Sequence, residues 1–129
     1  MHMQGTPRTM QDNPVYADVV AEVIEYLRGR RDALLASGIA QDRIALDPGI
    51  GFGKTTEHNL QLLANIGRFH GLGCPVLVGH SRKRFLPNPA SGTLEVAMTL
   101  ARQRVQILRV HDVAAVRQAL IAFQAAGGL

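Results

Sequence analysis

Residues 44–54 read IALDPGIGFGK, a short apolar run that ends in a glycine-rich polar loop. Residues 44–46 are too few for a helix and are bounded by charge, proline and glycine, so they predict a buried strand. Asp47 is then expected at the carboxyl end of that strand. In parallel α/β sheets the functional residues gather at the carboxyl ends of the strands, so the same arrangement is expected wherever another strand ends.

Two more apolar runs, rich in β-branched residues, predict strands at 75–78 and 105–110. Longer stretches with helical spacing lie between and around these runs. Alternating strands and helices predict a parallel α/β sheet covered by helices. Each predicted strand ends in polar, charged or glycine residues, at 47–54, 79–83 and 109–112, whereas its beginning does not. This asymmetry indicates a site along one edge of the sheet.

The spacing of apolar residues predicts four helices. The first is expected to begin with Asn13 as N-cap and Pro14 as first helical residue, and to stop at Gly38. The second is expected from about Thr56 to the glycines near 72, the third over about 94–103, and the fourth after an Asp112 cap. The expected apolar faces are Leu60, Leu63, Ile66 and Phe69 in the second helix, and Val113, Val116, Ala119, Leu120 and Phe123 in the fourth.

The length of 129 residues, with 47% hydrophobic and 19% charged residues, is that of one ordinary soluble globular domain. Cys74 is the single cysteine and has no disulfide partner in the chain, which favours a reducing compartment such as the cytoplasm. No apolar stretch reaches the roughly 20 residues of a membrane helix, and the N-terminus lacks the features of a signal peptide. We therefore expect a cytoplasmic protein without a membrane partner.

The net charge of +4 fits acidic small molecules or nucleic acid. Aromatic residues make up only 5% of the chain, so platforms for stacking single-stranded bases are scarce. The densest basic cluster, Arg28, Arg30 and Arg31, is too short for a nucleic-acid tail and is better explained as the solvated face of a helix. We expect no nucleic-acid partner.

The loop of residues 47–55 resembles a phosphate-binding loop without matching one. A Walker A loop needs glycine at the position of Pro48, and the glycines at 49, 51 and 53 miss the dinucleotide spacing by one residue. Asp47 has two possible roles. Its carboxylate could accept two hydrogen bonds from an amidine-like edge, as in a guanine-like ring, or it could form an Asx turn that shapes the loop.

The ends of the second and third strands carry cations. Ser81, Arg82 and Lys83 are expected where a helix starts, where they could meet an anion or an electron-rich ring, although a solvated basic turn is an equal alternative. Arg109 and His111 are two residues apart on one strand and so point to the same face. That pair fits a phosphate or pyrophosphate group, or else packs against Asp112.

The histidines and the cysteine do not form a metal site. The spacing of His2, His58, His70, His80 and Cys74 is not that of zinc ligands, so no metal ligand is predicted among them. Cys74 is expected to be a buried packing residue at the start of a strand.

Four segments resemble, in the right order, the dihydropteroate synthase family. These are Met1-His2-Met3-Gln4-Gly5-Thr6-Pro7, LDPGIGFGK at 46–54, GHSRK at 79–83 and LRVHDV at 108–113. The resemblance runs nearly from end to end. It implies a TIM (β/α)8 barrel that condenses 6-hydroxymethyl-7,8-dihydropterin pyrophosphate with para-aminobenzoate to give 7,8-dihydropteroate and pyrophosphate in folate biosynthesis. It also implies a sulfonamide target and a homodimer.

The resemblance assigns roles to individual residues. Asp47 would bind the amino-pyrimidine edge of the pterin, and Lys83 would bond the ring and lie between the two substrates. Phe52 and Gly79 would line the pocket, and Met1 would touch the pterin face. Ser81 and Arg82 would help to receive para-aminobenzoate. Arg109 and His111 would hold the pyrophosphate; with Lys83 they are the expected catalytic residues.

The resemblance also implies that residues 1–129 are one partial domain, from the end of barrel strand 5 through helix 8, because a full barrel needs eight strand–helix units in about 250 residues. Mg²⁺ would bind with the pyrophosphate through a loop of the absent half. The link 84–91 contains Pro87 and Pro89, so we expect the family's helix there to be shortened to a turn. Two alternatives stay open: an inactive half-barrel that self-associates through its sheet edges, and a phosphate-binding module without synthase activity.

Overall fold

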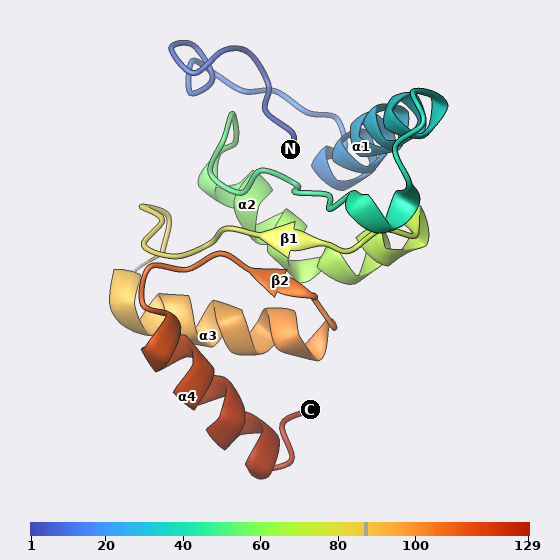
Figure 1. The fold of residues 1–129 in the computed structure, drawn as a ribbon. Coiled ribbons are helices and arrows are strands. Elements are labelled where there is room, and N and C mark those ends of the chain that lie inside the picture. The colour runs from blue at the N-terminus through green and yellow to red at the C-terminus, as the bar shows by residue number, and fades with distance from the viewer. Residues whose placement is uncertain (87) are drawn as a thin grey trace.

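Three parallel strand segments form the centre of the computed structural model, which describes residues 1–86 and 88–129 (Figure 1). Leu46 bridges to Val76 in parallel. Strand β1 (Leu77–Val78) pairs in parallel with β2 (Ile107–Leu108), with Leu77 opposite Ile107. The three predicted strands and their parallel direction are therefore confirmed, although the regular pairing is shorter than the apolar runs.

Helices flank this sheet in the alternating order that the sequence predicts. In Figure 1, α1 and α2 lie on one side of the strands, and α3 and α4 on the other. The elements are α1 (Val19–Ala36), η1 (Gln41–Arg43), α2 (Thr56–Ala64), η2 (Ile66–Leu72), α3 (Pro89–Arg102) and α4 (Val113–Ala125). No helix among the described residues is both long enough and apolar enough to cross a membrane.

Helix α1 begins later than predicted. Asp18, in extended conformation, is its N-cap and accepts hydrogen bonds from the amides of Val20 and Ala21 at 3.0 and 2.9 Å. Asn13 was the wrong choice because its φ of 51° is left-handed, whereas an N-cap has extended geometry. The helix starts instead after Asp18, a residue of the same capping type five positions further along the chain.

Helix α2 begins at the predicted Thr56, with Thr55 and His58 forming a reciprocal cap. Beyond Asn65 the chain tightens into the 3₁₀ helix η2. This helix ends at Gly73, whose φ of 71° lies in the left-handed region that favours glycine. The expected apolar face is partly wrong, since Leu60 is 51% exposed. Asn59 takes the buried position instead, because its side chain accepts from the Gly51 amide and donates to the Thr55 carbonyl.

Helix α3 starts at Pro89, with Asn88 as N-cap, rather than near residue 94. Proline is tolerated there because the first helical amide needs no partner within the helix. The expected helix start at Ser81 is wrong: residues 81–86 form turns, and Arg82 has a left-handed φ of 56°. The expectation that the link 84–91 forms a turn is therefore confirmed for residues 84–86, whereas residues 89–91 belong to α3. Pro87 lies outside the described residues.

Helix α4 has the predicted Asp112 cap, whose carboxylate accepts from the Ala115 amide at 2.9 Å. Its buried contact comes from Val116, while Val113, expected on the apolar face, is 64% exposed. Helices α3 and α4 pack on each other.

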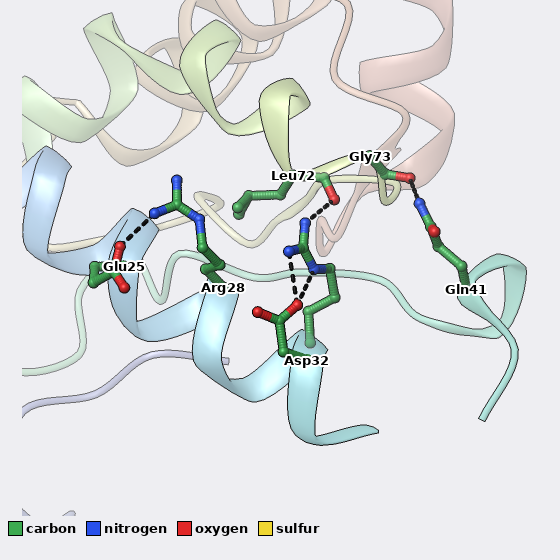
Figure 2. Close-up of polar contacts among 7 residues, drawn as sticks. Glu25, Arg28, Asp32, Gln41, Leu72 and Gly73 are labelled. Atoms are coloured by element: carbon green, nitrogen blue, oxygen red, sulfur yellow. Dashed lines mark hydrogen bonds and ion pairs between the residues drawn. The ribbon is translucent and has the colours of Figure 1, made fainter. Parts of the chain in front are cut away.

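The main hydrophobic core lies between the strands and the helices α1, α2 and η2. It includes Val23, Leu27, Leu62, Ile66, Phe69, Val76, Val78 and Cys74, so the predicted burial of the cysteine is confirmed. Polar contacts fix the outer rim of this core. Arg31 of α1 donates to the Leu72 carbonyl at 2.7 Å, and Gln41 donates to the Gly73 carbonyl at 2.6 Å (Figure 2). Arg28 pairs with Glu25 on the exposed face of α1, as expected of a helix face.

Candidate functional site

The three strand ends that the sequence singles out lie along one edge of the sheet. Asp47 follows the Leu46 bridge, Gly79 follows β1, and Arg109 follows β2. Parallel pairing places these ends together, and it continues past β2 because the Arg109 amide donates to the Val78 carbonyl at 2.9 Å. The predicted one-sided edge is therefore present.

Arg109 lies directly against Gly79. A methyl group built on Gly79 would stand 2.8 Å from Cζ of the Arg109 guanidinium, closer than real atoms approach. Only glycine at position 79 leaves room for the guanidinium where it is. Arg109 has no ion-pair partner among residues 1–86 and 88–129, so its charge is available to an anion.

Lys83 spans the site between the loop and Arg109. Its Nζ lies 4.4 Å from the centroid of the Phe52 ring, a cation–π distance, and a methyl group on Gly51 would stand 3.0 Å from Nζ. Burial lowers the pKa of Lys83, the Arg109 charge lowers it further, and Asp47 opposes both. These three charged groups therefore share one electrostatic environment.

Asp47 shapes its own loop. Its Oδ1 accepts from the Gly49 amide at 2.7 Å, the Asx turn that the sequence offered as one alternative. The carboxylate is half-buried, and its backbone carbonyl accepts from the His2 amide at 3.0 Å. Met1 is 55% exposed beside this loop, with Sδ 3.1 Å from a methyl group built on Gly49.

Ser81 and His111 form a contact that joins the second and third strand ends. The Ser81 Oγ lies 3.0 Å from Nδ1 of His111 and accepts from the His111 amide at 3.3 Å. Arg109 contacts Gly79 and His111 contacts Ser81, a register consistent with the Arg109 and His111 side chains on one face. Asp112 is engaged as the α4 cap and forms no ion pair with either residue in the described part of the chain.

A cavity of about 460 Å³ opens beside Phe52. Its cationic lining includes Arg82, Lys83 and Arg84, and no aspartate or glutamate contributes to its wall. The Arg82 amide is fixed by the Thr93 hydroxyl at 3.1 Å, so the turn is anchored to α3 while the side chain is exposed. Such a cavity favours an anion that carries a flat apolar part.

The buried lysine at position 54 is the functional candidate that sequence reasoning missed. Lys54 is 3% exposed, and burial lowers the pKa of its ammonium to about 7, although the negative charge of Asp47 acts to raise it. His2 is also buried, and desolvation lowers its pKa to about 4. The sequence places Lys54 at the end of a glycine-rich loop, but only the folded loop reveals that the side chain turns inward.

Residues 1–86 and 88–129 contain no group of three His, Cys, Asp or Glu side chains that could hold a metal ion. Two of the three charged groups at the edge, Lys83 and Arg109, are cationic and the third is Asp47; the imidazole of His111 lies beside them, bonded to Ser81. The side chains present therefore do not fit a protein-held divalent cation, and they fit an anion instead.

The sequence model described as "Pterin binding enzyme" matches residues 1–120. Dihydropteroate synthase of Haemophilus influenzae is 44% identical over 97% of this chain and 48% of its own length. The chain spans about half the length of the curated relatives it matches.

Solved structures agree with the fold. The dihydropteroate synthase of Yersinia pestis, solved with a sulfonamide drug, aligns with a TM-score of 0.90 at 37% identity over 98% of this chain and 49% of that one. The Thermus thermophilus enzyme, solved in complex with 6HMPPP and also with 4-aminobenzoate, aligns with a TM-score of 0.88 at 42% identity over 96% of this chain and slightly over half of that one, 53% and 54%. The predicted class, an α/β chain that is part of a TIM barrel, is confirmed.

Proposed function

The chain belongs to the pterin-binding enzyme family, and from this membership we propose that residues 1–129 supply the end of strand 5 through helix 8 of a dihydropteroate synthase barrel. The proposed reaction condenses 6-hydroxymethyl-7,8-dihydropterin pyrophosphate with para-aminobenzoate. The observation that carries the proposal is the convergence of Asp47, Lys83 and Arg109 at one edge of the sheet. Asp47 would match the N–H donors of the pterin, Lys83 its ring, and Arg109 the pyrophosphate.

The pterin is proposed to lie between Asp47 and Lys83. An ionised carboxylate matches the paired N–H donors of an amino-pyrimidine edge, and the Gly49 amide already orients the Asp47 carboxylate. Lys83 would donate to the ring from the other side, with Phe52 beneath it. Gly79 and Met1 would complete the pocket, because Gly79 leaves space for the Arg109 guanidinium and the exposed Met1 lies beside the Gly49 turn.

The pyrophosphate is proposed to bind Arg109 and His111. Arg109 has the planar fork that matches phosphate oxygens, and Ser81 fixes the position of the His111 ring. Para-aminobenzoate would enter the neighbouring cationic cavity, with its carboxylate near Arg82 and its ring beside Phe52. Ser81 lies next to Arg82 and lines the adjoining cavity that Arg82 also borders.

The reaction breaks the bond between the pterin methylene carbon and the pyrophosphate oxygen, and the electron pair leaves with pyrophosphate. The arylamine nitrogen then bonds to that carbon and loses a proton. Arg109, His111 and Lys83 would stabilise the charge that develops on the leaving group, which is where fixed electrostatics contribute most. Holding the two substrates in line supplies a further part of the rate.

Mg²⁺ belongs to the proposal only for the whole enzyme. The described residues offer no cluster for it, so no step here depends on the ion, and its protein ligand is expected outside this chain. A cytoplasmic location and a homodimer are part of the same proposal, the first supported by a single, buried cysteine.

Calorimetry tests the proposal through Asp47. We expect Asp47→Asn to weaken binding of the pterin pyrophosphate by at least about tenfold, because a hydrogen bond to a charged group contributes about 1.5–3 kcal/mol. Binding of inorganic pyrophosphate should not change. Asp42→Asn, the same substitution on the exposed η1 turn, is the matched control.

Two results would contradict the proposal. If Asp47→Asn binds the pterin pyrophosphate as tightly as the unaltered chain, the carboxylate does not recognise the ring. If the unaltered chain binds pyrophosphate as tightly as the pterin pyrophosphate, it is a phosphate-binding module. Formation of 7,8-dihydropteroate from the two substrates is the corresponding test of the whole enzyme.

A further inference from the structure

We propose that Lys54 is a positioning residue for pterin recognition: its enclosed side chain holds the loop of residues 47–54 in the shape that presents Asp47 and Phe52. This inference rests on the proposed function for what the loop recognises, but its structural part can be tested without any substrate. Lys54 borders the cavity beside Phe52, but only 3% of the residue is exposed, and its ammonium is bonded to the loop and to His2.

The Lys54 ammonium is saturated by the loop and the N-terminal segment. Nζ lies 3.0 Å from the Gly49 carbonyl, 2.8 Å from the Phe52 carbonyl and 3.0 Å from Nδ1 of His2. An ammonium has three N–H donors, and three acceptors surround it. The loop therefore folds around the side chain of its own last residue.

The glycines of the loop explain how its carbonyls can point inward. Gly49, Gly51 and Gly53 have φ values of 72°, 81° and 61°, the left-handed region that glycine enters at little cost. The Gly49 carbonyl accepts from the Phe52 amide as well as from Lys54. The glycine spacing that fits no phosphate-binding motif thus fits a loop that encloses a cation.

This enclosed cation fixes both recognition groups. The Phe52 carbonyl is bonded to Lys54 while the Phe52 ring lies under the Lys83 ammonium. On the other side, Gly49 links Lys54 to Asp47, because its carbonyl accepts from Nζ and its amide donates to the Asp47 carboxylate. Loss of the Lys54 donors would remove the Lys54 bond to the half-buried Phe52 carbonyl and leave the Gly49 carbonyl with the Phe52 amide alone, so the loop would have to rearrange to satisfy them.

The pairing with His2 lets Lys54 lose its proton without losing a contact. A neutral amine still donates to the two carbonyls, and its lone pair can accept from Nδ1–H if the His2 ring changes tautomer. Burial lowers the pKa of Lys54 to about 7, with Asp47 opposing, and desolvation followed by the Lys54 charge lowers that of His2 to about 4. The other charged groups that act on His2 are Glu22 and the amino group of Met1.

Lysine-selective NMR provides the test, since Lys54 and Lys83 are the only lysines in the chain. In the unaltered chain the Lys83 methylene signals should be shifted upfield by the Phe52 ring. We expect Lys54→Met, which keeps an unbranched side chain of nearly the same length but removes the donors, to abolish that shift and to weaken pterin pyrophosphate binding at least tenfold. Val23→Ala, a fully buried core truncation in α1, is the control for stability loss alone and should preserve both.

An unchanged Lys83 shift in a folded Lys54→Met chain would overturn the proposal. If the variant does not fold, the unaltered chain decides: titration should show the Lys54 signal and the tautomer of His2 changing together, with one midpoint near pH 7. Independent changes, or a Lys54 midpoint near its ordinary pKa, would overturn it equally. Failure of the unaltered chain to bind any pterin would instead reject the proposed function and leave the Lys83 shift as the measure of positioning.

Discussion

Replacing Gly79 by alanine separates the binding role of Arg109 from its role in the fold. The new methyl group would lie 2.8 Å from Cζ of Arg109, so the guanidinium must leave its place. The obstacle is the far end of a flexible side chain, and Gly79 does not have a left-handed φ, so the backbone accepts alanine. We therefore expect the fold to persist while the proposed pyrophosphate contact is lost.

The size of the effect follows from that contact. A hydrogen bond to a charged group contributes about 1.5–3 kcal/mol, so pterin pyrophosphate should bind the Gly79→Ala chain about ten to a hundred times more weakly. Calorimetry measures the affinity, and urea unfolding measures the stability. The control is Gly29→Ala in α1, where an added methyl group meets nothing within 4 Å. This control should gain about 0.5–1 kcal/mol of stability with unchanged affinity.

An affinity within twofold of the unaltered chain in Gly79→Ala would refute the reasoning, because it would mean that the position of Arg109 over Gly79 does not matter for binding. A large loss of stability would refute the claim that the backbone tolerates alanine.

Three further predictions concern stability. Asp112→Ala should cost about 1 kcal/mol in urea unfolding through loss of the α4 cap, and Asp112→Asn should restore most of it; equal losses in both would argue against capping. Leu27→Ala should cost about 2–5 kcal/mol because Leu27 is fully buried, whereas Leu60→Ala at the 51% exposed position should cost far less; similar losses would contradict the described core. Because the pKa of His2 is lowered from 6.5 to about 4, the unfolded chain binds the additional proton between these values, so stability should fall as pH drops through that window. His2→Gln should flatten this pH dependence, and an unchanged slope would contradict the assignment.

The sheet and its functional edge could be predicted because they depend on local rules. Short apolar runs bounded by glycine and charge predict strands, and the carboxyl ends of parallel strands must meet. Asp47, Lys83 and Arg109 are therefore expected to lie together as soon as the strands are assigned. Their mutual electrostatic effects are what that geometry implies.

The errors occurred where neighbouring residues compete. Asn13 and Asp18 are both acceptable caps, and only the backbone conformation decides between them. Leu60 is apolar, yet the buried position goes to Asn59 because a loop amide outside the helix needs its side-chain oxygen. Sequence periodicity does not contain that tertiary contact.

The role of Lys54 could not be predicted for a different reason. A lysine after a glycine-rich loop suggests an exposed ligand for phosphate, and in this fold the loop curls so that its carbonyls enclose the ammonium. Burial of a charge is a property of the completed loop. The sequence signal, three alternating glycines before a lysine, becomes informative only with the left-handed φ values in view.

NMR titration of the backbone amides with the pterin pyrophosphate is the most direct test of the central claim that the three strand ends form one pterin-binding edge. The account predicts coincident shifts, with a single dissociation constant, in the loop after Leu46, in residues 79–83 and in residues 109–111, and none around Gly29 on α1. Shifts confined to residues 109–111, or equal shifts with inorganic pyrophosphate alone, would contradict the account.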